Sequence, residues 1–367
     1  MTIEDLALLF TRGIGSRGAS HLVDYFGTAE ALFSASRAEL MEGAGLRADL
    51  AERILRREGM ADAEAEIKYA RRNNICIISA TDDDYPEQLR DAVDRPHILF
   101  VQGNVEALKC RTLSMVGTRE MTPSGLHACN TLVEGLKGVD NLAIVSGLAY
   151  GVDSACHRAA LANDIPTIAV VPTVLPEVVP APHRALADEI LRKGGAIVSE
   201  LHSKTRQNGQ LFIARNRIIA GLGMGLVVVE SPSSGGSLAT ADIADSYGRT
   251  IMAVPGRLSD MMSFGTNNLI RTGRARLLLT ASDIIADMGW ERTLSDVVRE
   301  AQSSPVMDNL SPAERLVLDA FTESAIVDWP SLMSSTGLSM GELAMATLNL
   351  EMAGLIRTLP GKRYEKV

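Results

Sequence analysis

The central part of the chain alternates short apolar runs with segments that have helical periodicity. Eight of these runs are expected to be strands: residues 98–101, 113–116, 142–145, 167–171, 196–199, 226–230, 251–254 and 275–279. Because the runs are apolar without alternation and are separated by helical segments, they predict a parallel sheet that helices cover on both faces. We therefore expect an α/β fold with an extended Rossmann-like parallel sheet over residues 76–288. Ligands of such sheets bind beyond the carboxyl ends of the strands, so the residues that follow each run are the candidate site.

Residues 1–75 have the pattern of a domain of short helices. Glycine turns at residues 13–16 and 43–46 lead into apolar-periodic segments at 19–26 and 48–55. Such pairs are typical of helix-hairpin-helix units, in which turn amides hold a DNA phosphate. The segment has ten basic and twelve acidic residues, so a small helical interaction module is an equally supported alternative.

The C-terminal part predicts a linker over residues 289–308 and a winged helix over residues 309–367. The winged helix is expected from three helical segments followed by a hairpin, at residues 312–321, 329–335, 339–353 and 354–364. Its expected recognition helix, at residues 340–346, has no arginine or lysine, and the whole segment has five basic and seven acidic residues. We therefore expect it to contact protein or to regulate the chain, because reading a DNA groove requires cationic side chains.

Length, composition and net charge limit the classes of function that this chain can have. A chain of 367 residues is too long for one core and predicts two or three domains. Its net charge of −9 argues against nonspecific wrapping of nucleic acid, although it leaves room for a local basic groove. No apolar run approaches the roughly 20 residues of a membrane span and no secretory signal is present, so we expect a cytoplasmic protein with no membrane partner. The four cysteines lack metal-ligand spacing, which favours buried thiols and predicts neither a metal site nor a cofactor.

The stretch with the most candidate binding residues is Arg215-Asn216-Arg217, which comes shortly before the apolar run at 226–230. Because a buried strand cannot host charge, we expect both arginines to lie at the approach to this strand, at the edge of the sheet. A planar, forked guanidinium suits phosphate oxygens, so the pair indicates an anion site. The alternative is that one of the arginines pairs with Glu200 or Glu230 and braces the fold.

Three further loops at strand ends contribute candidate residues. Gly117 and Arg119 precede a helix that is expected to open at Thr122 and Pro123. Residues 146–153 supply small residues ahead of a helix, and residues 231–241 open another helix with serines and glycines that can cradle phosphate. Neither a GxGxxG fingerprint nor the lysine of a Walker motif is present, so NAD binding and ATP hydrolysis are not supported.

Asp153 and His157 lie four residues apart and therefore share one face of the expected helix. They could form an acid and base pair for catalysis. A capping aspartate and a hydrogen-bonded structural histidine are favoured, because no nucleophile or metal set accompanies them.

Taken in order, these motifs resemble the DNA-processing protein A family (DprA/Smf). The resembling segments are residues 84–89, 98–100, 116–119, 146–153 with His157, 197–200, 215–217, 237–241, 248–249 and 254–256. The resemblance covers roughly residues 80–280, and the flanking domains match the family's sterile-alpha-motif-like domain and winged helix. It implies a protein that binds single-stranded DNA in a basic pocket of the Rossmann domain, dimerises and helps to load RecA during natural transformation or recombination. It implies no enzymatic activity.

The resemblance also implies which residues form the DNA pocket. They are Gly117, Arg119, Ser146, Gly147, Gly151, Arg184, Arg215, Asn216, Arg217, Ser237 and Thr240. The chain departs from the family in the loop at 171–184, where Arg184 aligns with a basic position, and in Ile213-Ala214, which replaces the usual proline before Arg-Asn-Arg. These departures are expected to reshape the side of the pocket that faces the bases.

Two other functions are compatible with the same pattern. One is a nucleotide-binding or nucleotide-hydrolysing enzyme of the lysine-decarboxylase-like group, which shares the fold and the phosphate loop; the chain lacks that group's Pro-Gly-Gly-x-Gly-Thr motif. The other is a winged-helix regulator whose sheet senses a ligand, which the acidic balance of residues 309–367 disfavours.

Overall fold

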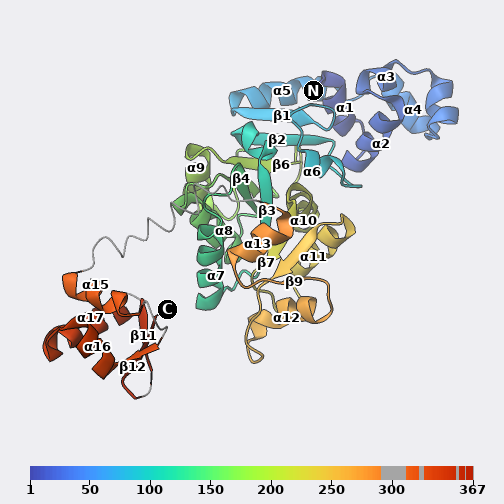
Figure 1. Ribbon diagram of the computed structural model, residues 1–367. Helices are drawn as coiled ribbons and strands as arrows, with labels where there is room; N and C mark the ends of the chain where they lie inside the picture. Colours follow the sequence, from blue (N-terminus) through green and yellow to red (C-terminus); the bar gives the residue numbers. More distant parts are fainter. Residues whose placement is uncertain (291–310, 322–325, 353–354, 360, 367) are drawn as a thin grey trace. The chain divides into compact units, whose positions relative to one another are not determined.

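The computed structural model describes residues 1–290, 311–321, 326–352, 355–359 and 361–366. The chain forms two compact units, Met1–Arg292 and Thr293–Val367, and each is described by itself (Figure 1). The predicted linker at 289–308 lies outside the described residues except for its first two positions.

A nine-stranded sheet organises the first unit. Its order is β1-β2-β6-β5-β4-β3-β7-β8-β9, and the strands are β1 (Ile75–Ser79), β2 (Ile98–Gly103), β3 (Arg111–Val116), β4 (Leu142–Ser146), β5 (Thr167–Val170), β6 (Ala196–Ser199), β7 (Gly225–Val228), β8 (Thr250–Ala253) and β9 (Arg276–Leu277). The seven strands from β6 to β9 are parallel, which confirms the predicted Rossmann-like architecture.

The expectation of a wholly parallel sheet is wrong at one edge. β2 pairs antiparallel with both β6 and β1, and β1 was not among the predicted strands. Antiparallel neighbours need no crossover helix, and the connection between β1 and β2 contains one helix of only four residues, Glu87–Arg90. It therefore lacks the long helical segment that revealed the other strands.

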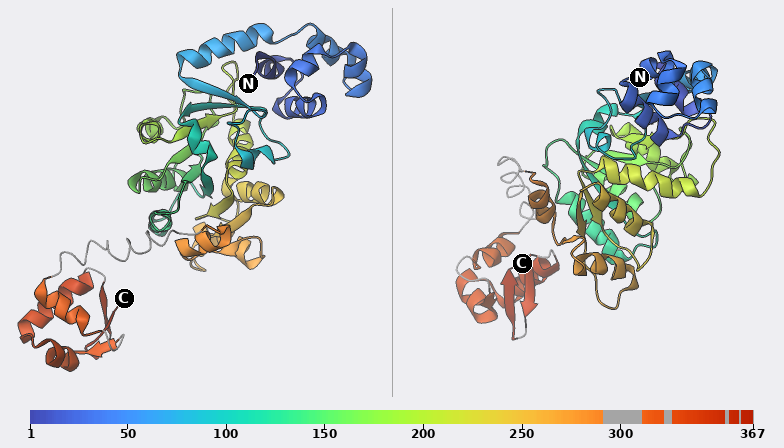
Figure 2. Two further views of the ribbon diagram at one scale, coloured as in Figure 1. Left: turned by 45° about the horizontal axis from the view of Figure 1, so that its top comes forward. Right: turned by 90° about the vertical axis from the view of Figure 1, so that its right-hand side faces the viewer.

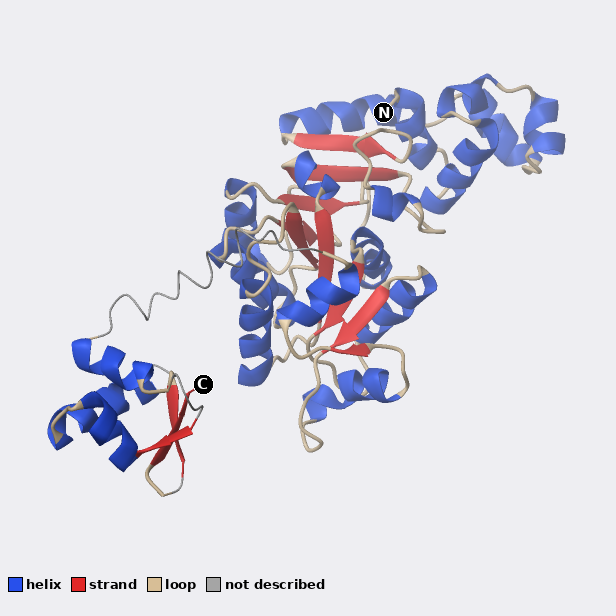
Figure 3. Cartoon of the chain, viewed as in Figure 1, coloured by secondary structure: helices blue, strands red, loops and turns tan. Residues whose placement is uncertain are grey.

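Helices cover both faces of the sheet (Figures 2 and 3). The helices between and after the strands are α6 (Glu87–Arg90), α7 (Pro123–Glu134), α8 (Val152–Ala162), α9 (Arg184–Arg192), α10 (Gln210–Leu222), α11 (Gly236–Ser246), α12 (Phe264–Arg271) and α13 (Ala281–Met288). One core contains buried residues of α10 and α11, and another contains those of α7, α8 and α13. As predicted, α7 opens with Pro123 behind the N-cap Thr122, whose hydroxyl accepts a hydrogen bond from the Gly125 amide.

The N-terminal segment consists of α1 (Ile3–Phe10), α2 (Ser16–Phe26), α3 (Ala29–Ser34), α4 (Ala48–Leu55) and α5 (Met60–Arg72). The two glycine turns lead into α2 and α4 as the sequence predicts. Buried residues of these helices share one core with β2, β5, β6 and α9. Packing is therefore continuous across residue 75, and residues 1–290 belong to one compact unit.

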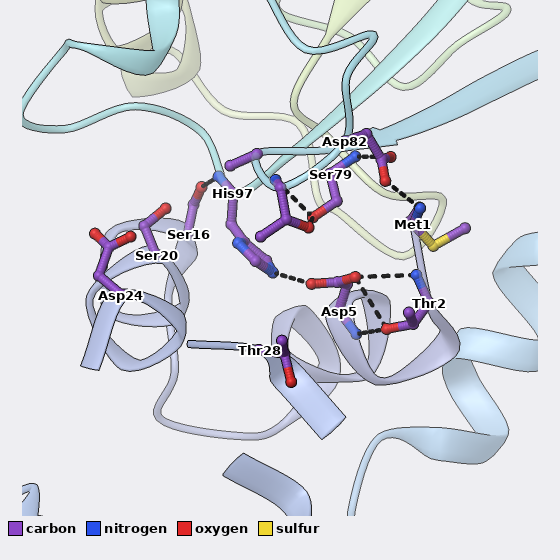
Figure 4. Close-up of polar contacts among 12 residues, drawn as sticks. Met1, Thr2, Asp5, Ser16, Ser20, Asp24, Thr28, Ser79, Asp82 and His97 are labelled. Carbon is purple, nitrogen blue, oxygen red and sulfur yellow. Dashed lines mark hydrogen bonds and ion pairs between the residues drawn. The ribbon is translucent and has the colours of Figure 1, made fainter. Parts of the chain in front are cut away.

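A buried contact between a histidine and a carboxylate fixes α1 to the segment that leads into β2 (Figure 4). His97 Nε2 lies 3.3 Å from Asp5 Oδ1, and the His97 and Asp5 side chains are 0% and 3% exposed. Burial raises the pKa of Asp5, but the neighbouring His97 and the hydrogen bonds from Thr2 outweigh burial and lower it to about 2. The His97 amide donates to Ser16 Oγ at 3.0 Å, which joins α2 to the same segment.

The second unit has the predicted winged-helix fold. Its elements are α15 (Pro312–Asp319), β10 (Ile326–Asp328), α16 (Trp329–Thr336), α17 (Met340–Met352), β11 (Ile356–Leu359) and β12 (Arg363–Lys366), with strand order β10-β12-β11. Leu332, Leu343 and Leu350 are fully buried in its core. Met345 and Leu348 of α17 are more than half exposed, so the helix that would enter a DNA groove presents apolar side chains.

Three of the four cysteines are buried free thiols, as predicted, whereas Cys76 on the edge strand β1 is exposed. Cys129 Sγ and Cys156 Sγ lie 3.6 Å apart between α7 and α8. Among the described residues there is no cluster of side chains that could hold a metal ion. No helix in the described part of the chain has the length and apolarity to cross a bilayer.

Candidate nucleic-acid interface

A hollow of about 410 Å³ opens beyond the carboxyl ends of β3, β4 and β7. We call it the arginine pocket. Its lining comes from the loops after β3, β4, β7 and β8, from α10 and from the starts of α8 and α11: Val116, Gly117, Thr118, Arg119, Glu120, Ala149, Asp153, Phe212, Ile213, Arg215, Asn216, Ile219, Pro232, Ser234, Gly235, Gly236, Ser237, Thr240 and Met262. The pocket therefore lies where ligands of a parallel sheet are expected.

Arg215 forms the floor of this pocket, but it lies within α10 and not at the approach to a strand as the sequence predicted. The apolar residues of 212–222 pack against the sheet at helical spacing, which places the two arginines on different sides of the helix. Arg215 is buried, and its Nη1 donates to the carbonyl oxygens of Gly147, at 2.5 Å, and Val170. Burial lowers the pKa of Arg215 to about 10, although the negative charge of Asp153 opposes this effect. The guanidinium remains a cation at neutral pH.

Arg119 is the accessible cation of the pocket. It is exposed, and no hydrogen bond or ion pair joins it to another residue in the described part of the chain. It lies in the loop between β3 and α7, facing the same hollow as Arg215. A guanidinium without a protein partner in such a position is available to a phosphate oxygen.

The start of α11 forms the polar wall. Ser234, Gly235, Gly236 and Ser237 line the pocket where the helix begins. The first amides of a helix have no partner within it and favour an anion. The hydroxyls of Ser237 and Thr240 bind within the protein, to Ser231 Oγ and the Gly236 carbonyl, both at 2.9 Å. The backbone, more than these hydroxyls, is therefore the source of anion contacts.

The predicted glycines allow the loops to close around the pocket. A Cβ at Gly117 would lie 2.9 Å from the Glu230 carbonyl oxygen, and one at Gly147 would lie 2.6 Å from Arg215 Nη1. Gly151 has a φ of 73°, and a Cβ there would overlap the Thr118 carbonyl. Of these three, only Gly117 lines the pocket. Ser146 is fully buried and donates to the Met115 carbonyl at 2.7 Å, so its hydroxyl faces the sheet.

Arg217 and Arg184 lie outside the pocket lining. Arg217 pairs with Glu200 and donates to the Asp94 carbonyl at 2.6 Å, which agrees with the alternative that one arginine braces the fold. Arg184 lines a different cavity. The structure thus gathers Gly117, Arg119, Arg215, Asn216, Ser237 and Thr240 in one hollow, and places Ser146, Gly147, Gly151, Arg184 and Arg217 around or away from it.

Asp153 and His157 do not form a catalytic pair in the pocket. Asp153 lines the hollow, and its carboxylate accepts a hydrogen bond from the Ala149 amide at 3.2 Å. Burial raises the pKa of Asp153, and the charge of Arg215 opposes this rise. His157 is fully buried with Nδ1 2.7 Å from Thr167 Oγ1, and burial lowers its pKa to about 3. A hydrogen-bonded structural histidine is the alternative that the sequence favoured. The capping aspartate is not found, because the N-cap of α8 is Gly151 and not Asp153.

The sequence did not identify the apolar wall of the pocket. Phe212 and Ile213 of α10 and Met262 line it. Helical periodicity over residues 212–219, which places Phe212, Arg215, Asn216 and Ile219 on one face, was the signal that could have found the first part. Met262 comes from a segment whose sequence gives no such signal.

Comparisons with known proteins identify two matching family models. The model described as DNA recombination-mediator protein A matches residues 76–289, and that of the DprA winged helix domain matches residues 301–362. Protein Smf of Escherichia coli is 34% identical over 304 residues, covering 81% of this chain and 79% of that protein.

Two solved structures have a similar fold. The X-ray structure of DNA processing protein A from Streptococcus pneumoniae has a TM-score of 0.69 at 31% identity, covering 79% of this chain and 99% of that one. DNA processing protein A from Helicobacter pylori, whose structure concerns its single-stranded DNA binding mode, has a TM-score of 0.53 at 25% identity, covering 59% of this chain and 97% of that one.

Proposed function

Since this chain belongs to the DNA recombination-mediator protein A (DprA/Smf) family of DNA-processing proteins, we propose that it binds single-stranded DNA in the arginine pocket. We further propose that it dimerises and helps to load RecA onto that DNA in transformation or recombination, and that it acts by binding without catalysing a reaction. The DNA-binding proposal is supported by the Helicobacter pylori relative, whose structure is described as a single-stranded DNA binding mode.

The observation that carries the proposal is the division of the pocket into a cationic, amide-rich part and an apolar part. Arg119 and the start of α11 offer charge and amides to a phosphate, while Phe212 and Ile213 offer apolar surface. A single strand exposes both its phosphates and the faces of its bases, whereas a duplex keeps its base faces stacked inside. The arrangement therefore fits single-stranded DNA and predicts sequence-tolerant, salt-sensitive binding.

Arg119→Ala is the direct test of this site. We expect the affinity for an oligothymidylate to fall by about tenfold, and the slope of log affinity against log salt to fall by about 0.7, because one phosphate contact is lost. Fluorescence anisotropy titrations at several salt concentrations measure both quantities. The free energy of unfolding should stay unchanged, because Arg119 has no hydrogen bond or ion pair with the described part of the chain. Unchanged affinity and salt slope would contradict the proposed site.

For the dimer we propose the sheet edge formed by β9. This two-residue strand ends the strand order, and within the described residues it pairs with β8 alone. Leu277 is 49% exposed and Leu279 is 66% exposed beside it. An edge strand flanked by exposed leucines is suited to pairing with a second copy of the chain.

Leu279→Asp is expected to convert the dimer to a monomer, because a charge beside this edge would be desolvated on association. Light scattering after size-exclusion chromatography measures the mass. Val93→Asp is the matched control, since Val93 is 88% exposed on another part of the surface and should leave the dimer intact. A Leu279→Asp protein that remains dimeric would show that the interface lies elsewhere.

A further inference from the structure

Glu230 follows β7 and is buried, but it does not line the arginine pocket. It lines a different hollow, of about 720 Å³, together with Thr122 and Gly125 from the start of α7. The sequence offered Glu230 as a partner for an arginine, but Arg217 pairs with Glu200 instead. Because a buried carboxylate is costly without hydrogen bonds, other donors have to hold it.

Two hydrogen bonds from one residue hold the Glu230 carboxylate. The Thr122 amide donates to Oε2 at 2.9 Å, and the Thr122 hydroxyl donates to Oε1. Thr122 is also the N-cap of α7, and its hydroxyl oxygen accepts a hydrogen bond from the Gly125 amide at 3.2 Å. The start of a helix favours a negative charge, so the carboxylate fixes both the cap residue and the helix that follows it.

The backbone of Glu230 holds the other end of the same loop. Its carbonyl oxygen accepts a hydrogen bond from the Thr118 amide at 2.8 Å, and residues 119–121 lie between this attachment point and Thr122. The Thr118 end is held a second time, because its own carbonyl oxygen accepts from the Val152 amide at 3.2 Å. Within the described residues, the hydrogen bonds of Thr122 to groups outside α7 all go to the Glu230 carboxylate. Residue 230 therefore clamps both ends of the segment that carries the accessible cation of the pocket.

Gly125 leaves room for this carboxylate. A Cβ at Gly125 would overlap the Glu230 carboxyl group and would lie 2.8 Å from its Oε1. Gly125 lies inside α7, where glycine is a weaker helix former than alanine. The glycine therefore costs the helix some stability and keeps the carboxylate in contact with Thr122. Gly125→Ala can displace the carboxylate without removing its charge.

From these contacts we infer that Glu230 is a positioning residue for single-stranded DNA. Its carbonyl oxygen and its carboxylate hold the loop from Thr118 to Thr122, so that Arg119 faces the arginine pocket before DNA arrives. The inference rests on the proposed function of that pocket. A cation that is already held in its bound position loses little freedom on binding, so more of its attraction contributes to the affinity. A loop released at Thr122 would have to be ordered by the DNA and would bind it more weakly.

The test measures the affinity of the full chain for an oligothymidylate, at several salt concentrations, in Glu230→Ala and Gly125→Ala, each with and without Arg119→Ala. Glu230→Ala removes the acceptor, whereas Gly125→Ala displaces it and leaves its charge. The matched control is Glu66→Ala. Glu66 is 2% exposed and accepts hydrogen bonds from the Ser203 amide, at 2.9 Å, and from the Ser203 hydroxyl. The control therefore removes the same pair of hydrogen bonds from a loop that does not line the arginine pocket.

We expect Glu230→Ala and Gly125→Ala to lower the affinity by up to about tenfold and the salt slope by up to about 0.7, which are the losses expected for Arg119→Ala itself. In the Arg119→Ala background neither substitution should lower the affinity further, because the cation that it misplaces is already absent. A purely structural role would weaken binding equally in both backgrounds. Glu66→Ala should leave the affinity and the salt slope unchanged.

An equal loss of affinity with and without Arg119 would overturn the inference. Unchanged affinity in both single variants, or a loss of the same size in Glu66→Ala, would also overturn it. Chemical denaturation shows whether each variant is folded, and Gly125→Ala decides alone if Glu230→Ala is not, since alanine is the better helix former. Failure of the proposed function looks different: Arg119→Ala alone would then bind the oligothymidylate as tightly as the unchanged protein.

Discussion

Replacing Gly151 by alanine is expected to destabilise the first unit by about 2–6 kcal/mol and to abolish tight binding of single-stranded DNA. Two costs add at this position. The backbone has φ 73° and ψ −128°, a region that side chains other than glycine rarely adopt, at a cost of about 1–3 kcal/mol. The new Cβ would overlap the Thr118 carbonyl and lie 2.7 Å from the Arg119 carbonyl carbon, and relieving such crowding costs about 1–3 kcal/mol.

Loss of binding follows because the crowded backbone is that of Arg119, the accessible cation of the pocket. Moving the loop from 117 to 119 away from Gly151 displaces this guanidinium relative to the start of α11. Chemical denaturation gives the free energy of unfolding, and anisotropy titration gives the affinity.

Gly194→Ala separates the two costs. Gly194 has a φ of 80°, and a Cβ there would meet nothing within 4 Å. The free energy of unfolding of this variant should therefore fall by only about 1–2 kcal/mol, which is the cost of the backbone conformation. It should also bind DNA normally, because Gly194 lies just before β6, at the opposite edge of the sheet from the pocket. Equal stability and equal affinity for the two alanine variants would refute the steric account of Gly151.

Arg215→Ala is expected to lower the free energy of unfolding by about 3–5 kcal/mol as well as to weaken DNA binding. The substitution leaves the carbonyl oxygens of Gly147 and Val170 without their donor and removes the cation that faces the buried carboxylate of Asp153. Arg215 therefore has a structural role in addition to the binding role that its place in the expected pocket implies. The side chain is part of the pocket floor, and only Arg119 tests binding free of a structural cost.

The stability deficit of Arg215→Ala should depend on pH. Burial raises the pKa of Asp153, and the charge of Arg215 opposes this rise, so removal of Arg215 raises the pKa further. A carboxyl group whose folded pKa is raised favours the folded state below its unfolded pKa, and this contribution is lost as the pH rises through the folded pKa. The deficit should therefore be smaller in mildly acidic buffer than at neutral pH.

A double-mutant cycle with Asp153→Asn tests whether the loss of stability in Arg215→Ala comes from the Asp153 carboxylate. If Arg215 stabilises the Asp153 carboxylate, the double variant should lose less stability than the sum of the two single variants, and the pH dependence of the deficit should disappear. Additive losses with no pH dependence would assign the whole effect to the two carbonyl acceptors. Arg192→Ala, an exposed change on α9, should stay within about 0.5 kcal/mol of the unchanged protein.

The strands that are apolar throughout were predictable, and so was the architecture they imply. Runs such as 142–145 and 226–230 are apolar without alternation, which in a soluble protein requires burial on both faces. β1 escaped prediction because its pairing with β2 depends on which strand lies beside it and not on a local pattern. The packing of residues 1–75 against the sheet was not predictable for the same reason. Asp5 and His97, for example, are far apart in sequence and come into contact only in the folded chain.

The candidate site was predictable as a set of loops, because the ends of parallel strands lie along one edge whatever the loops contain. Which residues turn inward was not predictable. Arg215 and Arg217 are two residues apart, and on a strand they would point the same way. On α10 they lie about 200° apart, so one forms the pocket floor and the other pairs with Glu200.

Read alone, the sequence determined the α/β class, the winged helix, and the strand ends at which anion-binding residues gather, because local periodicity and turn chemistry are written in neighbouring residues. The tertiary structure decided that Arg119 is the accessible cation, that Phe212 and Ile213 form an apolar wall, and that Arg184 belongs to a separate cavity. Those outcomes depend on helix orientation and on contacts between residues distant along the chain, and such contacts exist only once the sheet has brought the loops together.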